Sequence, residues 1–287
     1  MCGRLAFLTK RGKDALIIGA FSFLLMISNA SAAEKQMPRP VQAHLTYQVY
    51  AGGVHVLESR LDLTISDDFY RAFLSSYTKG FLGRLVPWKG SFESVGGPRP
   101  GGVFQVRRHK SISTWKGSDD TAVYTYKKDG SFNTLELTED GIKRPSDKID
   151  PNLTKDTTDV LAATLMMMYK MDTAGKCENE HAIFDSRRRF KLQFHDGADE
   201  NLARSRYNIY SGMARRCVVE VVPDGGAWHK KPRGWLSIQE QGRKKGTLPT
   251  LWIARVDDKL PPVPVRIMIK TNYGTLMMHL TDVDVQK

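Results

Sequence analysis

Most of this chain alternates apolar and polar residues with a period of two, which is the pattern of half-buried β-strands. The alternation is clear in Leu45, Tyr47 and Val49 and returns between short turns to the end of the chain. Asp129-Gly130 lies between two such runs and is typical of a hairpin, because glycine permits the positive φ of a tight turn. The fold class predicted is mainly β, with one large antiparallel sheet. A sheet of so many strands is expected to curl into a half-barrel, a β-spiral or an open barrel.

One principal helix is predicted at about Thr157–Met171, with Asp156 or Thr157 as its N-cap. Its apolar residues surround much of the helix, which predicts that it packs on the sheet. In this interpretation Met167 and Met168 are core residues. In the alternative interpretation they line an adaptable apolar pocket, because methionine repacks easily.

Three stretches have the composition of loops. Residues 96–102 contain four glycines and two prolines and are expected to be flexible. Residues 139–156 are polar and are expected to form a second loop. Residues 223–247 are basic and rich in glycine and proline, and predict an excursion from the sheet.

The N-terminus has the pattern of a secretory signal peptide over residues 1–33. Basic residues precede an apolar run from Ala15 to Ile27, and small residues suited to cleavage follow. The apolar run is shorter than the roughly 20 residues that a membrane-spanning helix needs. We therefore expect Sec-type export and a single periplasmic β-rich domain over residues 34–287, with no transmembrane segment in the mature chain.

Two cysteines, Cys177 and Cys217, remain once Cys2 is removed with the leader. An even number of cysteines in an exported chain predicts a disulfide. The alternative is a metal site, but His181 is the one further ligand near Cys177 and nothing comparable flanks Cys217. We expect the disulfide, and neither a metal nor a cofactor.

The chain carries a formal net charge of +12. In a cytoplasmic protein this balance would suggest nucleic acid. The anions available to an exported protein are lipid headgroups and acidic envelope polymers, so no nucleic-acid partner is expected. General solubility is the alternative use of these charges.

Two basic clusters give the candidate ligand-binding residues. Arg187, Arg188 and Arg189 lie in strand-like sequence, where alternation turns one of them away from the other two. They pair either with a carboxylate of the chain or with an acidic ligand. Residues 230–233 and 243–245 place lysines and arginines around Trp228 and Trp235, a combination that suits a lipid–water interface as well as a solvated loop.

Motifs of catalysis are weak. His195-Asp196, and His181 with Asp185, offer a base and a carboxylate, yet there is no Gly-x-Ser-x-Gly elbow and no His-Glu-x-x-His. A Ser-His-Asp triad assembled from distant positions leaves no motif, so that alternative stays open. We predict that the protein is not an enzyme.

Several positions together resemble an uncharacterised bacterial family, the domain of unknown function numbered 3108. The resemblance covers the second half of the mature chain well and the first half loosely. The family usually carries glycine where this chain has Ser186, which predicts a less tight turn here. The matching residues are Asp159, Leu161-Ala162-Ala163, Cys177, Phe184-Asp185, Arg187-Arg188, Gly212, Ala214, Cys217, Trp252-Ile253-Ala254, Pro262-Val263-Pro264-Val265-Arg266, Thr271, Gly274 and Leu280.

The resemblance implies a periplasmic β-rich domain similar to curved-sheet lipoprotein carriers and sensors, and it implies no reaction. We expect a non-enzymatic envelope protein that binds a lipid, a lipoprotein or another amphipathic component on its concave face. The alternative is a scaffold that holds an acidic polymer or a protein partner on its basic surface. A long apolar cavity would favour the carrier, and a filled core would favour the scaffold. A histidine hydrogen-bonded to serine or aspartate in a cleft would favour a hydrolase.

Overall fold

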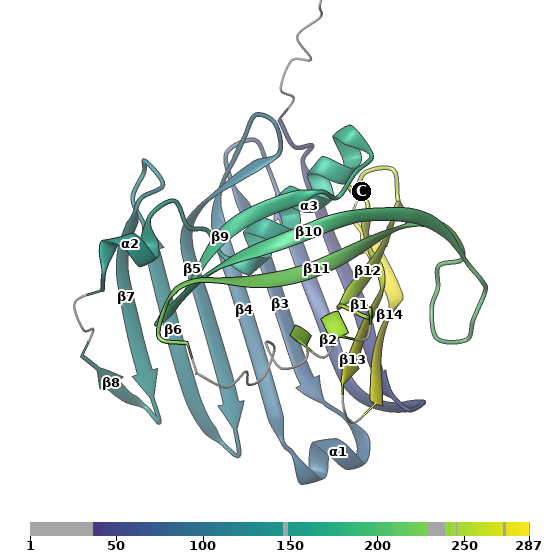
Figure 1. Cartoon of the computed structure of the whole chain (residues 1–287), viewed down its shortest axis with the longest axis horizontal. Coiled ribbons are helices and arrows are strands. Elements are labelled where there is room, and N and C mark those ends of the chain that lie inside the picture. Colours follow the sequence, from purple (N-terminus) through teal and green to yellow (C-terminus); the bar gives the residue numbers. More distant parts are fainter. Residues whose placement is uncertain are drawn as a thin grey trace, which may run out of the picture. The chain divides into compact units, whose positions relative to one another are not determined.

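The computed structural model describes residues 37–145, 149–228, 239–240, 242–244, 246–271 and 274–286. They form a 14-stranded antiparallel sheet that curves around a helix (Figure 1). The strand order is β8-β7-β6-β5-β4-β3-β2-β1-β14-β13-β12-β11-β10-β9. The predicted mainly β fold with one curved sheet is therefore confirmed. The predicted signal peptide and Trp235 lie outside the described residues.

The elements follow the alternating pattern of the sequence. The strands are β1 Val41–Ala51, β2 Val54–Ile65, β3 Tyr70–Thr78, β4 Trp88–Arg99, β5 Val103–Trp115, β6 Ser118–Tyr126, β7 Phe132–Glu139, β8 Ile142–Arg144, β9 Asn179–Asp185, β10 Arg188–Leu202, β11 Gly212–Gly226, β12 Thr250–Ala254, β13 Val263–Thr271 and β14 Gly274–Val285. The helices are α1 Gly80–Leu85, α2 Pro151–Thr154 and α3 Val160–Ala174. None of these helices is long and apolar enough to cross a membrane, nor is any other in the described part of the chain.

The first and last strands of the chain pair with each other, which makes one sheet from its two halves. Ala43 lies opposite Val285, and Ala51 lies opposite Leu276. Every other neighbouring pair in the order is also antiparallel. Strands β8 and β9 are thus the two edges of the sheet.

Aromatic side chains connect the two sides of this open sheet. The ring of Phe184 on β9 lies 5.6 Å from that of Phe132 on β7 and 6.1 Å from that of Tyr124 on β6. The N–H of Thr158 also donates a hydrogen bond of 2.9 Å to the carbonyl of Ala182 on the outer edge of β9. Side-chain packing therefore joins the two sides of the sheet, and a single bridge from Thr158 ties β9 to the segment before α3.

Helix α3 begins later than predicted, because Asp159 is its N-cap. The Oδ1 atom of Asp159 accepts hydrogen bonds from the N–H groups of Leu161 at 2.8 Å and Ala162 at 3.0 Å. The predicted cap Asp156 instead adopts a φ of 54° in the preceding turn. The other predicted cap, Thr157, donates its hydroxyl to the carbonyl of residue 154.

Residues 96–102 are not the flexible loop predicted, because β4 continues through them to Arg99. Gly96 lies opposite Val106, and a Cβ atom on it would lie 2.0 Å from the carbonyl oxygen of Gln105 and 2.8 Å from the ring of Tyr70. Glycine is needed here because the Tyr70 ring and the backbone of Gln105 approach it closely. Composition alone does not distinguish this use of glycine from its use in a turn. The predicted loop over residues 139–156 is also interrupted, by β8 and α2.

The predicted excursion at residues 223–247 begins later than expected. Strand β11 runs to Gly226, four residues beyond the Val222 at which the sequence pattern weakens. Residues 229–238, the middle of this stretch, lie outside the described residues.

The two ends of the sheet differ. Because successive strands are antiparallel, the turns at residues 65–70, 99–103 and 126–132 share one end. We call it the helix end, since Gly102 there packs against Tyr169 of α3. Residues 51–54, helix α1 and residues 115–118 lie at the opposite end, which we call the open end (Figure 1).

Large side chains fill the concave face at the helix end. Leu63, Tyr70 and Phe104 point inward and are at most 2% exposed, as are Met167 and Met168 of α3. The rings of Tyr70 and Phe104 meet edge to face with their centroids 5.0 Å apart. This half of the interior is a close-packed core.

Small residues occupy the same face nearer the open end. Ser59, Ser76, Gly90 and Ser113 lie side by side in register across β2 to β5. The hydroxyl groups of Ser59 and Ser76 are hydrogen-bonded at 2.8 Å. The ring of Trp88 packs over Gly90 in this row, and its indole N–H donates to the hydroxyl of Ser113 at 3.1 Å.

Candidate functional site

An apolar groove of about 560 Å³ lies on the concave face beside α3. Its size is within the range of small-molecule sites. Strand alternation turns the groove residues inward, so each strand contributes every second side chain. They include Phe190, Leu192 and Phe194 of β10, Val219 and Val221 of β11, and Ile267 and Ile269 of β13.

Charged and aromatic groups mark one rim of this groove. Arg188 and Asp185, which flank the β9–β10 turn, form an ion pair. The guanidinium carbon of Arg188 lies 5.0 Å from the centre of the Trp228 ring, a cation–π arrangement. The Trp228 indole N–H donates to the carbonyl of Gly225 at 2.7 Å, and its ring meets Phe190 edge to face. The rim therefore joins an amphipathic ring and a cation to an apolar wall.

Only one of the three predicted arginines lines the groove. Arg187 lies in the β9–β10 turn and is exposed. Arg189 points to the other face, where it pairs with Asp224 at 2.7 Å and donates to the carbonyl of Lys155 at 2.5 Å. The expectation that strand alternation separates the arginines holds for Arg188 and Arg189.

The turn that carries Arg188 is tight, contrary to the prediction from Ser186. Asp185 and Arg188 are paired, which leaves a two-residue turn. Ser186 adopts a φ of 44°, in the left-handed region that favours glycine. The serine accepts this conformation rather than opening the turn.

The remaining predicted site residues lie elsewhere. Met167 and Met168 are in the core and are not among the groove residues. Within the described part of the basic excursion, Arg243 is paired with Glu220, and Lys244 with Glu240 at 3.5 Å. Trp235 cannot be placed, since it lies outside the described residues.

A second chamber of about 400 Å³ adjoins the groove at the N-terminus of α3. Leu74, Val160, Asp185 and Phe190 line both spaces, which places them side by side. Burial raises the pKa of Tyr124 in the chamber wall to about 12. The phenol is therefore neutral and available as a hydrogen-bonding group.

A buried polar network forms the floor of this chamber. The hydroxyl of Ser94 donates to Oδ2 of Asp159 at 2.6 Å and is itself 2.9 Å from the hydroxyl of Tyr70. Nδ1 of His109 lies 3.7 Å from Oδ1 of Asp159. The sequence analysis missed this group, because only the β4–β5 register, with Ser94 opposite His109, brings it together.

The network does not have the order of contacts that a Ser-His-Asp triad requires. A triad places histidine between serine and aspartate, so that it can accept the serine proton. Here Asp159 lies between Ser94 and His109, and the Ser94 hydroxyl is fully buried. Asp159 also caps α3, so the network supports the helix and the chamber wall.

The other predicted base–carboxylate pairs are separated. His195 lies between Glu178 and Glu220, at 3.6 and 3.3 Å. His181 is buried in the wall of a third space, near Met166, and burial lowers its pKa. Asp185 is paired with Arg188. Among the described residues, no three His, Cys, Asp or Glu side chains are grouped as metal ligands would be.

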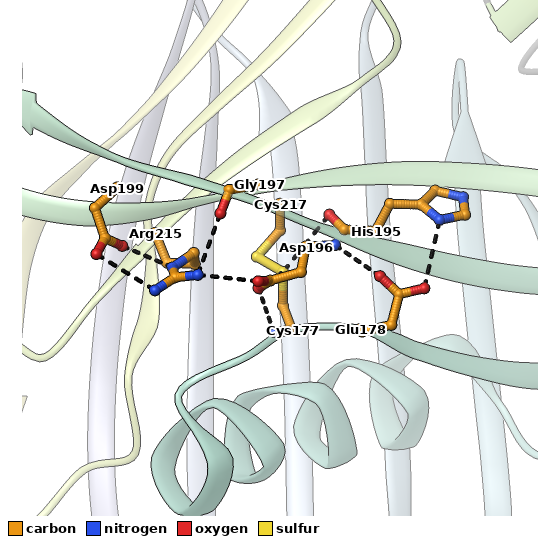
Figure 2. The surroundings of a disulfide bond; sticks show 8 residues. All are labelled: Cys177, Glu178, His195, Asp196, Gly197, Asp199, Arg215 and Cys217. Carbon is orange, nitrogen blue, oxygen red and sulfur yellow. Dashed lines mark hydrogen bonds and ion pairs between the residues drawn. A yellow bond between two sulfur atoms is a disulfide. The ribbon is translucent and has the colours of Figure 1, made fainter. Parts of the chain in front are cut away.

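Cys177 and Cys217 form a disulfide, as predicted from the sequence. It connects the segment after α3 to β11, and both cysteines are fully buried. Figure 2 shows Asp196 beside it, where the carboxylate accepts the N–H of Cys177 at 2.9 Å and pairs with Arg215, also at 2.9 Å. Asp196 thus has a structural role next to the disulfide.

Comparisons with known proteins place the chain in a family. The crystal structure of the beta-barrel-like protein of domain of unknown function DUF1849 from Brucella abortus is similar, with a TM-score of 0.48 and 8% identity. The similarity covers 87% of this chain and 99% of that one. No curated protein matches. The family described as "Protein of unknown function (DUF3108)" matches residues 46–281, and the chain belongs to it.

Proposed function

We propose that this protein is a non-enzymatic periplasmic component of the bacterial cell envelope. It binds a lipid, a lipoprotein or another amphipathic molecule in the concave groove and so supports the envelope. The observation that carries the proposal is the groove itself, an apolar space of about 560 Å³ with Arg188 and Trp228 at its rim. A hydrocarbon chain suits the wall, and a polar headgroup suits the rim.

The compartment is supported by the disulfide and by the N-terminal sequence. Disulfides persist in oxidising compartments such as the periplasm. The Cys177–Cys217 bond is buried in the core, where it belongs to the fold. The basic, apolar and small-residue segments of residues 1–33 are the pattern of an export signal.

The scaffold alternative has less support. It requires a filled core and a free basic surface. The concave face instead holds the groove, and Arg243 and Lys244 of the basic excursion are paired with carboxylates. Paired cations are less available to an acidic polymer than free ones.

Native mass spectrometry of the protein purified gently from a bacterial periplasm, together with lipid extraction, tests the proposal. A co-purifying lipid or acylated peptide at near-unit ratio is the expected result and identifies the class of ligand. An apo mass that stays unchanged after incubation with envelope lipids would contradict it.

A matched pair of variants on β13 locates the site. Ile269→Trp fills the groove, whereas Lys270→Trp adds the same ring to the opposite face of the strand at an exposed position. We expect Ile269→Trp to abolish binding of a fluorescent lysophospholipid and Lys270→Trp to leave it unchanged. Equal binding by the two variants would place the ligand outside the groove.

A further inference from the structure

The open end of the sheet presents a cluster of apolar side chains to solvent. Phe81 and Leu85 of α1 are 66% and 59% exposed, Val54 beside the first turn 62%, and Trp115 at the end of β5 47%. Hairpin geometry places all four at this end, since residues 51–54, α1 and residues 115–118 connect strands there. Apolar groups gathered on turns of one end mark an interaction surface.

Helix α1 does not use the side chains of Phe81 and Leu85 to fold. None of its residues is buried. Backbone and hydroxyl hydrogen bonds hold it instead, because the N–H of Val86 donates to Leu82 at 2.7 Å and the hydroxyl of Thr78 donates to Val86 at 2.8 Å. Phe81 and Leu85 are therefore presented outward by a helix whose position does not depend on them.

Positive charge surrounds these apolar groups. Residues 79–89 contain three cations, Lys79, Arg84 and Lys89, and no carboxylate. Lys79 pairs with Glu58 at 3.3 Å, while Arg84 and Lys89 form no ion pair with the described part of the chain. Apart from Glu58, acidic residues of the same end lie toward β6 and β8, where Asp140 accepts the hydroxyl of Ser118. The charge at α1 itself is thus basic.

We infer that this surface, which we call the α1 tip and define by Val54, Phe81, Leu85, Arg84 and Lys89, docks on the surface of an anionic lipid bilayer. Aromatic and aliphatic groups enter the headgroup boundary, and neighbouring cations meet lipid phosphates. A six-residue helix is far too short to cross the membrane, so contact is interfacial and reversible.

The lining of the groove reaches toward the end of the sheet that carries the α1 tip. Ile269 in the groove wall is close in sequence to the β13–β14 turn, which shares the open end with α1 because Ala51 lies opposite Leu276. Docking would thus bring the groove toward the bilayer. This inference goes beyond the proposed function and does not depend on what the groove binds.

Vesicle flotation tests the docking. The protein is mixed with vesicles of phosphatidylcholine with phosphatidylglycerol, or of phosphatidylcholine alone, at low salt. We expect the unchanged protein to bind the anionic vesicles. The double variant Phe81→Ser/Leu85→Ser should lower the partition coefficient at least about tenfold, and Arg84→Glu/Lys89→Glu should lower it by a similar factor. All proteins are prepared identically, so that any contribution of residues 1–36 is common to them.

Two controls make the result specific. Phe69→Ser/Val103→Ser removes exposed apolar groups of the helix end and should float like the unchanged protein. Ile269→Trp should also float normally, even if it abolishes binding in the groove. The inference is overturned if the unchanged protein does not bind anionic vesicles. It is overturned as well if Phe81→Ser/Leu85→Ser binds them as strongly as the unchanged protein, or if Ile269→Trp is the one variant that loses binding. It is also overturned if sedimentation shows that the tip joins two copies of the chain instead.

Discussion

The two ends of the concave face are built by the same strands yet have different interiors. At the helix end, Leu63 and Tyr70 are fully buried in the core that also contains Met167 and Met168 of α3. Four residues from Leu63 along β2, on the same face, Ser59 is hydrogen-bonded to Ser76 in a row of small residues. One strand therefore packs large apolar side chains at one end and buried, hydrogen-bonded serines at the other.

The difference teaches that the inward side chains of one strand can change from apolar packing to polar pairing along its length, although strand alternation stays the same. Both kinds of residue are buried here, Leu63 completely and Ser59 to within 2%. The apolar groove is lined by other residues, among them Leu74 of β3, Val160 of α3 and Ile269 of β13.

The disulfide should give the largest effect, because it ties the segment after α3 to β11. We expect the double variant Cys177→Ala/Cys217→Ala to lose about 4 kcal/mol of unfolding free energy, from the loop-closure entropy of a 40-residue separation. Urea denaturation measures the loss. Binding in the groove at low temperature should persist, since neither cysteine lines it.

Reduction of the unchanged protein is the matched control and should lower the unfolding free energy by a similar amount, because it breaks the same bond. Thiol labelling of the unfolded, unreduced protein should modify neither Cys177 nor Cys217. If both are labelled, or if the double variant is as stable as the unchanged protein, the disulfide does not stabilise the fold.

A pair of leucines on β2 compares the two ends directly. Leu63 is fully buried at the helix end, while Leu57 is on the same face of the strand, half-buried near the open end. We expect Leu63→Ala to cost about 3 kcal/mol, because it leaves a cavity in packed surroundings. Leu57→Ala should cost about 1 kcal/mol, since it removes a smaller buried area beside open space.

Thermal and urea unfolding of the two leucine variants measure the contrast. Equal losses would mean that the open end is as tightly packed as the helix end.

The sequence predicted the strands and the single curved sheet because period-two alternation is local. It also predicted the disulfide, by cysteine count and compartment. It could not predict what an inward residue packs against, so the buried hydrogen bond between Ser59 and Ser76 was not foreseen. The chamber floor was missed for a related reason, since Ser94 and His109 meet only through the register of β4 and β5. Gly96 was assigned to a loop because the reason for glycine there, the close packing of the Tyr70 ring, is a tertiary contact that the sequence does not show.

The smallest effect is expected at the groove rim, in the two-residue turn between β9 and β10. Ser186 has a φ of 44°, a conformation that costs a residue with a Cβ about 1 kcal/mol and costs glycine little. Ser186→Gly should therefore raise the unfolding free energy by somewhat less than about 1 kcal/mol, because glycine also gains entropy in the unfolded chain. Arg187→Gly, at the neighbouring turn position without a positive φ, should lower it. Urea midpoints of the two variants give the sign of each change. If both glycines act in the same direction, the turn is not strained, and the rim that positions Arg188 is held by its contacts with Asp185 and Trp228 alone.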